Sequence, residues 1–249
     1  MTKEELNSMK SDDLPFIPAL NELFVKIYAV KKADEQAKIR KTTSGNYLWR
    51  VQSRIWDIKQ NIDDIALTEQ LIAGHDPGFS KLDKTVNAAK LIRYDYENFF
   101  LRMGKMRDLF LQLINEVMIL NLKKAPNMEK KLLKMLSSTD PNFVKAWADI
   151  AKDLDELKPY RNHIAHNGFI EIPDLALVNA FYTFDMKFEN RLEEYRHEFV
   201  ISDTQRELVD KFSAVIRSHL ANIDQYLKLI YLFLYAPFIK NLDSMIEKK

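Results

Sequence analysis

Apolar residues recur every three or four positions along most of the chain, which is the spacing of one buried face of an α-helix. This pattern predicts a helix that runs from about residue 20 into the polar region 31–46, and a long helix over about 48–73. The polar stretch Thr42–Asn46 is expected to form the loop between them.

The strongest helical signal lies between about residues 80 and 122, where the apolar positions alternate steps of four and three through four heptads. Phe100, Leu109 and Ile114 widen this stripe beyond a two-position seam, which indicates the central helix of a globular bundle. Gly104 inside it costs roughly 1 kcal/mol relative to alanine, and Pro126 is expected to end the helix. The stripe itself consists of Ile92, Tyr96, Phe99, Met103, Met106, Phe110, Leu113, Val117 and Leu120.

The second half of the chain continues the helical pattern. A short basic helix is predicted at about 127–137, and Asp140 followed by Pro141 marks the start of the next one. Pro159 is expected to interrupt the segment after that, and residues 169–172 form a short extended connector. Two more helices follow, over about 178–199 and from about 202 onwards. Ser202 with Gln205 resembles a capping box, and Pro237 is expected to bend or stop the last helix.

These elements predict an all-α protein of about seven to nine helices. The turn around Gly74, Pro77 and Gly78 could separate an N-terminal helical pair from the rest, but helices this amphipathic are expected to share one core. We therefore expect a single helical domain over residues 1–249, with about 1–78 as a helical extension.

Composition narrows the class of protein. Lys and Arg number 37 and Asp and Glu 36, so a net charge of +1 gives no global attraction to nucleic acid or to anionic lipid. The absence of cysteine excludes disulfides, thiol nucleophiles and cysteine-based zinc sites. The first residues do not resemble a signal peptide, and the longest apolar run, Leu229–Ile239, is too short to span a bilayer. A soluble cytoplasmic protein without membrane contact is the expectation.

One segment gathers side chains that suit catalysis. It reads Tyr160-Arg161-Asn162-His163-Ile164-Ala165-His166-Asn167-Gly168. A guanidinium group binds phosphate oxygens in bidentate fashion, and an imidazole group can accept the proton of a ribose 2′-hydroxyl near neutral pH. Arg161 and His166 therefore suit the cleavage of a phosphodiester without a metal ion.

This segment resembles the motif of the HEPN superfamily, in which an arginine and a following polar residue precede a histidine by four to six intervening residues. Arg161, Asn162 and His166 match the motif, and Ala165 and Gly168 agree with its surroundings. The resemblance implies a HEPN-like core at about 79–247, a homodimer and no cofactor. It also implies a metal-independent endoribonuclease that leaves 2′,3′-cyclic phosphate ends, of the kind found in toxin and phage-defence systems with an antitoxin or a regulatory protein as partner.

The same resemblance assigns roles to individual residues. His166 and Arg161 would act on the 2′-hydroxyl and the scissile phosphate, Asn162 would orient one of them, and His163 is a possible helper at the phosphate. The family also tends to carry an acidic residue that orients the arginine. The candidates on the long helix are Asp95, Glu97 and Asp108.

Helical geometry sets a condition on this site. Residues five apart on an ideal helix differ by about 140°, so Arg161 and His166 do not share a face, whereas Asn162 and His166 do. A distorted turn at the helix end, or a second copy across a two-fold axis, would bring the two catalytic side chains together.

Other interpretations stay open. The segment could simply be a polar helix end, or the chain could be a non-catalytic HEPN-like module that binds a nucleotide, RNA or protein, or a purely structural dimer. Metal binding has little support, since His163 and His166 lack further ligands and Glu194 with His197 lacks a second such pair. Arg191–His197 repeats the motif spacing without its polar and glycine neighbours, so we interpret it as a solvated face. A basic cluster could contact an RNA backbone, although such clusters are usually only solvated; its members are Lys123, Lys124, Lys130 and Lys131.

Overall fold

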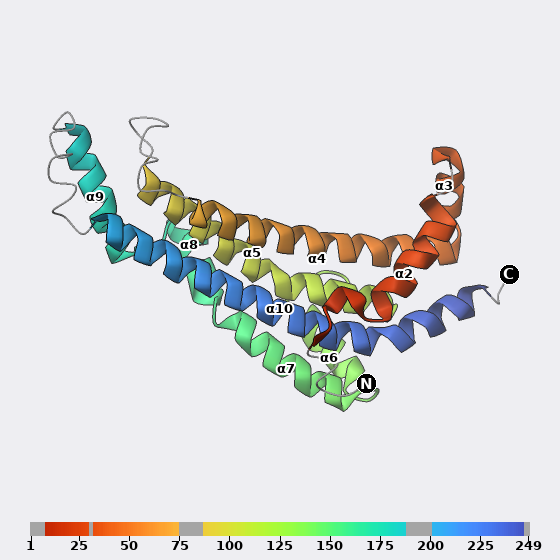
Figure 1. Cartoon of the computed structure of the whole chain (residues 1–249). Coiled ribbons are helices and arrows are strands. Elements are labelled where there is room, and N and C mark those ends of the chain that lie inside the picture. Colours follow the sequence, from red (N-terminus) through yellow and green to blue (C-terminus); the bar gives the residue numbers. More distant parts are fainter. Residues whose placement is uncertain (1–7, 30–31, 75–86, 188–200, 247–249) are drawn as a thin grey trace. The chain divides into compact units, whose positions relative to one another are not determined.

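The computed structural model describes residues 8–29, 32–74, 87–187 and 201–246, and within these ranges the chain forms helices and no strands. Figure 1 shows that three long helices dominate the fold: α4 (Thr43–Ala73), α5 (Ala88–Val117) and α10 (Ile201–Ile246). The shorter α-helices are α2 (Phe16–Phe24), α3 (Ala33–Arg40), α6 (Met128–Leu136), α7 (Pro141–Asp155), α8 (Lys158–Asn167) and α9 (Pro173–Lys187). A 3₁₀ turn, η1 (Ser11–Asp13), precedes α2, and a π-helical turn, η2 (Val25–Ala29), follows it. The all-α prediction is confirmed.

The chain divides into two compact units, and the three long helices each contribute to both. Unit 1 takes its described residues from Met1–Gln60, Lys105–Asp153 and Ala221–Lys249. Unit 2 takes them from Asn61–Gly104 and Leu154–Leu220. The proposed boundary between an extension at 1–78 and a core at 79–247 stays a prediction.

The core of unit 1 is built from aromatic side chains of helices distant in sequence. Phe16 packs against Tyr231 and Phe238, with ring centroids 5.3 and 5.4 Å apart. Phe143 of α7 stacks on Phe233 of α10 at 3.7 Å. Such offset and edge contacts add to the stabilisation that comes from burying the rings.

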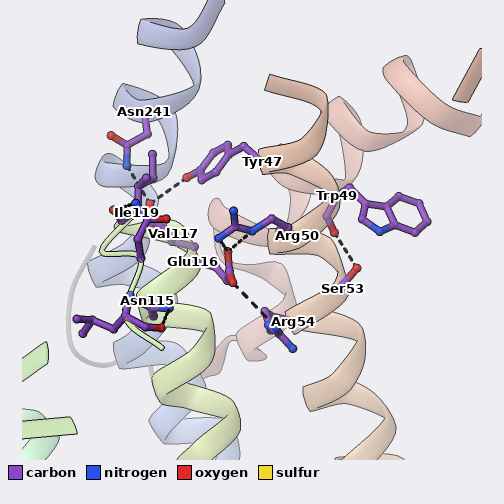
Figure 2. A network of polar contacts seen from close by, with 12 residues as sticks. Tyr47, Trp49, Arg50, Ser53, Arg54, Asn115, Glu116, Val117, Ile119 and Asn241 are labelled. Carbon is purple, nitrogen blue, oxygen red and sulfur yellow. Dashed lines mark hydrogen bonds and ion pairs between the residues drawn. The ribbon is translucent and has the colours of Figure 1, made fainter. Parts of the chain in front are cut away.

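Polar contacts tie α4, α5 and α10 together at one end of unit 1 (Figure 2). The Tyr47 hydroxyl and the Asn241 amide both donate to the Val117 carbonyl, at 3.0 and 2.9 Å. Arg50 donates to the Glu116 carboxylate at 2.6 Å. These bonds satisfy a carbonyl at the C-terminus of α5 and a buried carboxylate, groups that are costly to bury without partners.

Unit 2 has its own aromatic core on α5. Tyr96 stacks on Phe212 of α10 at a centroid distance of 4.0 Å, and Phe99 is fully buried beside them. Phe100 stacks on Tyr160 of α8 at 4.8 Å. This contact fixes the start of α8 on α5.

The sequence placed several element boundaries incorrectly. Thr42–Asn46 is not a loop, because α4 already begins at Thr43 and Gly45 lies in its first turn. A β-carbon on Gly45 would lie 2.2 Å from the Ile39 carbonyl oxygen, so glycine is needed where α3 approaches α4. Pro159 does not interrupt a helix but lies in the first turn of α8. Pro237 does not stop α10, which continues to Ile246.

The central helix is also shorter than predicted. It ends at Val117 because the Asn115 side chain accepts from the Leu122 N–H at 2.9 Å and donates to its carbonyl at 3.2 Å. These two bonds close a tight reversal in which Ile119 and Asn121 adopt positive φ angles of 53° and 52°.

The other predicted elements either agree with the structure or lie outside the residues that it describes. The short basic helix is α6, and Asp140 caps α7 by accepting from the Phe143 N–H at 2.9 Å. The helix predicted to about residue 199 is described only as far as Lys187. The turn at Pro77–Gly78, the Ser202 side chain and the Arg191–His197 segment lie outside the described residues.

One helix meets a length and composition test for crossing a membrane. The segment Asp203–Ile246 has a mean hydropathy of 1.2 in its most apolar 18-residue window, of which 28% is buried. Core helices of soluble proteins pass the same test, and α10 does bury Ile230, Tyr231 and Leu234 completely. The expected absence of membrane contact stays a prediction.

Candidate active site

The Arg-His motif lies on α8, a ten-residue helix of unit 2 with defined ends. Pro159 occupies its first turn, where the missing N–H costs nothing. Gly168 ends the helix with a left-handed φ of 83°, and its N–H donates to the Ile164 carbonyl at 2.8 Å. The glycine that accompanies the motif therefore terminates its helix.

Only one side of α8 is buried. Ile164 faces the core of unit 2 at 7% exposure, while Arg161, Asn162 and His166 are all exposed. On an ideal helix, Asn162 and His166 point about 160° away from Ile164 in either direction, and Arg161 about 60° away. Asn162 and His166 thus project outward, and Arg161 starts at the edge of the buried face.

Arg161 crosses α5 at a glycine. A β-carbon on Gly104 would lie 2.2 Å from the Arg161 Cδ, closer than a β-carbon approaches other atoms, and 3.0 Å from its Nε, a tight contact. The guanidinium Nη1 lies 3.5 Å from the Gly104 carbonyl oxygen, a long hydrogen bond. From the sequence alone, Gly104 was expected only to lower the stability of the helix. In the structure it provides the space in which the Arg161 side chain lies.

The other polar residues of the motif differ in their contacts. His163 is paired with Asn167, one turn later, through a 3.0 Å contact between Nδ1 and the Asn167 Nδ2. Within the described ranges, the side chains of Asn162 and His166 make no hydrogen bond, so both are available to a ligand. The interpretation of the segment as a set of locked capping residues is not favoured.

Within the described residues, none of the three candidate acidic helpers forms a hydrogen bond or an ion pair with the Arg161 guanidinium. Glu97 accepts from the Ile170 N–H at 2.8 Å, so it holds the connector that follows α8. Asp95 is buried at 7% exposure, and Asp108 belongs to unit 1, where it lies 3.7 Å from Lys124. The Gly104 carbonyl is the only hydrogen-bond acceptor of Arg161 among the described residues.

The regular geometry of α8 bears on how the site could be assembled. The helix shows no distorted turn before Gly168, so the angle of about 140° between Arg161 and His166 holds. One copy alone presents the arginine and the histidine in different directions.

A cavity of about 310 Å³ opens directly after the motif in unit 2. It is lined by Lys90 and Arg93 of α5 and by the connector that begins at Phe169, whose ring lies 5.7 Å from the Arg93 guanidinium carbon. Sequence reasoning missed this cavity, whose charged lining residues are Lys90, Arg93 and Glu171. Lys90 and Arg93, three residues apart on one helix, were a detectable signal.

The weaker site predictions are placed as follows. Lys123, Lys124, Lys130 and Lys131 are all exposed, and all belong to unit 1, not to the unit that carries the motif. Across the described residues, no three His, Asp or Glu side chains gather in a way that could hold a metal ion. Glu194 and His197 lie outside those residues.

An all-helical chain with an exposed Arg-x4-His segment on a short, glycine-terminated helix has the attributes of a HEPN-like protein. A comparison with protein families agrees, since the model of the Cthe2314-like HEPN family matches residues 20–231. The chain belongs to this HEPN family, and the match includes α8 and Gly104. Searches of the curated proteins and of the solved structures with this chain found no match.

Proposed function

We propose that this protein is a metal-independent endoribonuclease in which Arg161 and His166 act on RNA. The observation that carries the proposal is the exposed motif on α8, with Arg161 laid over Gly104, in a chain of a family whose domains are commonly ribonucleases. Neither catalytic side chain is committed to a buried contact. Both are accessible to a phosphodiester.

The proposed reaction is an internal transesterification. His166 accepts the proton of the ribose 2′-hydroxyl, and the 2′-oxygen attacks the phosphorus atom. Arg161 binds the non-bridging oxygens and stabilises the charge that develops on them. The bond from phosphorus to the 5′-oxygen breaks, the leaving oxygen takes a proton from a second acid, and a 2′,3′-cyclic phosphate remains.

We further propose that the active protein is a homodimer in which α8 of each copy completes the site of the other. The angle between Arg161 and His166 supports this, because a partner histidine could face an arginine that its own histidine cannot reach. Large exposed apolar side chains near the motif support it as well: Tyr160 at 49%, Phe169 at 42% and Leu177 at 60%.

A mixing experiment tests the shared site. Arg161→Ala and His166→Ala proteins are each expected to be inactive. When they exchange subunits at random, half of the dimers carry one intact composite site, so about one quarter of the wild-type activity should return. No recovery, with subunit exchange verified by mass spectrometry, would contradict the shared site.

The cleavage assay tests the function itself. Wild type, Arg161→Ala and His166→Ala are incubated with a mixed RNA in EDTA, with Lys158→Ala, an exposed cationic residue of the same helix, as the control. We expect cleavage by wild type and by Lys158→Ala, and a loss of at least 10²-fold in the other two. Equal cleavage by all four proteins would point to a contaminating ribonuclease and contradict the proposal.

A non-catalytic HEPN-like module that binds a nucleotide, RNA or protein is the alternative function. It is favoured by one observation: Arg161 has no carboxylate partner among the described residues to orient it. A folded dimer that binds RNA with an affinity dependent on Arg161, without turnover, would support it. A role in a toxin or phage-defence system, with an antitoxin or regulatory partner, is part of the first proposal.

A further inference from the structure

A second cavity, remote in sequence from the motif, lies entirely within the first 60 residues and in unit 1. Its volume is about 510 Å³, within the range of small-molecule sites, and it lies among α2, η2, α3 and α4. Its walls include four aromatic side chains, one arginine and one buried amide: Phe24, Tyr28, Trp49, Trp56, Arg40 and Gln52.

The cavity is held open by specific contacts. The Tyr28 hydroxyl donates to the Gly45 carbonyl at 2.7 Å, and the Gln36 amide donates to the Tyr28 carbonyl at 2.8 Å. Gly45 lets α3 approach α4 closely at Ile39. The wall contributed by α3 is therefore fixed against the walls contributed by η2 and α4.

The aromatic side chains offer a surface for a planar ligand. Phe24, Tyr28 and Trp49 form one cluster, with ring centroids 4.8, 5.8 and 5.6 Å apart. Trp56 is 69% exposed although it lines the cavity. Figure 2 shows Trp49 projecting from α4 away from the Glu116 network. Rings with an accessible face are well suited to stack on a heteroaromatic base.

A buried glutamine amide indicates which polar group a ligand of this cavity should have. Gln52 lines the cavity at 8% exposure, and its Oε1 is buried without a hydrogen-bond partner in the described structure. A buried acceptor without a donor is unfavourable, so a ligand that brings an N–H group would satisfy it. A glutamine amide can pair in bidentate fashion with the amino group and a ring nitrogen of adenine.

The charge around the cavity selects against a cationic ligand. The Arg40 guanidinium lies 3.2 Å from the centroid of Trp49 and makes no ion pair with any described residue. Asp57, the acidic residue of the lining, is already paired with Arg54 at 3.0 Å. A quaternary ammonium group, which aromatic cages otherwise bind, would meet this arginine, whereas a phosphate would be attracted by it.

We propose that this cavity binds an adenine mononucleotide. The base stacks on Trp56, its amino group donates to the Gln52 Oε1, and its phosphate pairs with Arg40. The site is distinct from the Arg-His motif, and it can exist whether or not the protein cleaves RNA.

Titration calorimetry on the full-length protein tests the proposal with four probes: AMP, adenosine, UMP and the N6,N6-dimethyl derivative of AMP. We expect AMP to bind at least 10-fold more tightly than UMP or the dimethylated nucleotide, which has no amino hydrogen to donate. Trp56→Ala and Gln52→Leu should each weaken AMP binding at least 10-fold, and Trp56→Tyr should retain it. Arg40→Ala should weaken AMP but not adenosine. Tyr94→Ala, an exposed aromatic in unit 2, is the matched control.

Several results would overturn the proposal. One is the absence of AMP binding at millimolar concentration by a wild-type protein whose circular dichroism shows it to be helical and cooperatively folded. Another is AMP binding that Trp56→Ala leaves unchanged, because the ligand would then bind elsewhere. Binding to a single-stranded oligoribonucleotide but to no mononucleotide would also reject it.

Discussion

Replacing Gly104 with alanine should separate the stability of the protein from its activity. Alanine is favoured over glycine inside a helix by about 1 kcal/mol, so the change by itself stabilises α5. Its β-carbon, however, would lie 2.2 Å from the Arg161 Cδ, and an ordinary contact begins at 3.4 Å, so the arginine must retreat by 3.4 − 2.2 = 1.2 Å. Because Arg161 is exposed, it can move without unfolding the core. A displacement of about 1 Å in a positioning group can cost about 10²-fold in rate.

We therefore expect Gly104→Ala to unfold in urea with a free energy equal to the wild type or up to about 1 kcal/mol higher, and to cleave RNA about 10²-fold more slowly. In an Arg161→Ala background the clash is absent, so the same change should give the full gain of about 1 kcal/mol. Lys105→Ala, at the next and exposed position, is the control. Unchanged cleavage by Gly104→Ala, or a loss of several kcal/mol in both backgrounds, would refute the reasoning.

Two further predictions concern the stability of the fold. Burial alone would raise the pKa of Asp224, but the Ser11 N–H and the Lys228 ammonium outweigh it and hold the pKa below its usual value of 3.8. A carboxylate whose pKa is lowered in the folded state stabilises the protein above its unfolded-state pKa, and this contribution is lost as the pH falls through the folded-state pKa. Asp224→Asn should therefore make the free energy of unfolding in urea fall less steeply below about pH 4. An unchanged decrease of that free energy at acid pH would contradict this. Gly168→Ala should lower the free energy of unfolding by about 1 kcal/mol, because φ is 83° there and no atom lies within 4 Å to contribute otherwise; equal stability in urea would mean that α8 can end without its left-handed residue.

Much of the fold follows from the sequence because the information is local. The apolar stripe from Ile92 to Val117 contains the period of a buried helix, and Asp140 before Pro141 contains the start of another. The errors arise where a specific contact six or seven residues away decides, because helical periodicity does not reveal such a contact. Gly45 resembles a loop residue until the approach of Ile39 is known, and the early end of α5 depends on a side-chain pairing with Leu122.

For the candidate site as well, some features could be predicted from the sequence and others depend on the tertiary fold. The spacing of Arg161 and His166 and the glycine after them are properties of the sequence, and so the motif could be found there. That Arg161 lies over Gly104, 57 residues earlier in the chain, is a tertiary contact that no spacing reveals. The sequence also left three acidic helpers for Arg161 open, and they stay a prediction, although Glu97 binds the connector.

The central claim is that His166 and Arg161 cleave RNA without a metal ion, and the chemistry of the product ends tests it most directly. Purified wild type and His166→Ala are incubated in EDTA with an RNA labelled at its 5′ end, and the products are analysed by mass spectrometry. The account predicts fragments that end in a 2′,3′-cyclic phosphate with the wild type and none above background with His166→Ala. Fragments with 3′-hydroxyl ends, or cyclic phosphate ends produced equally by both proteins, would contradict it.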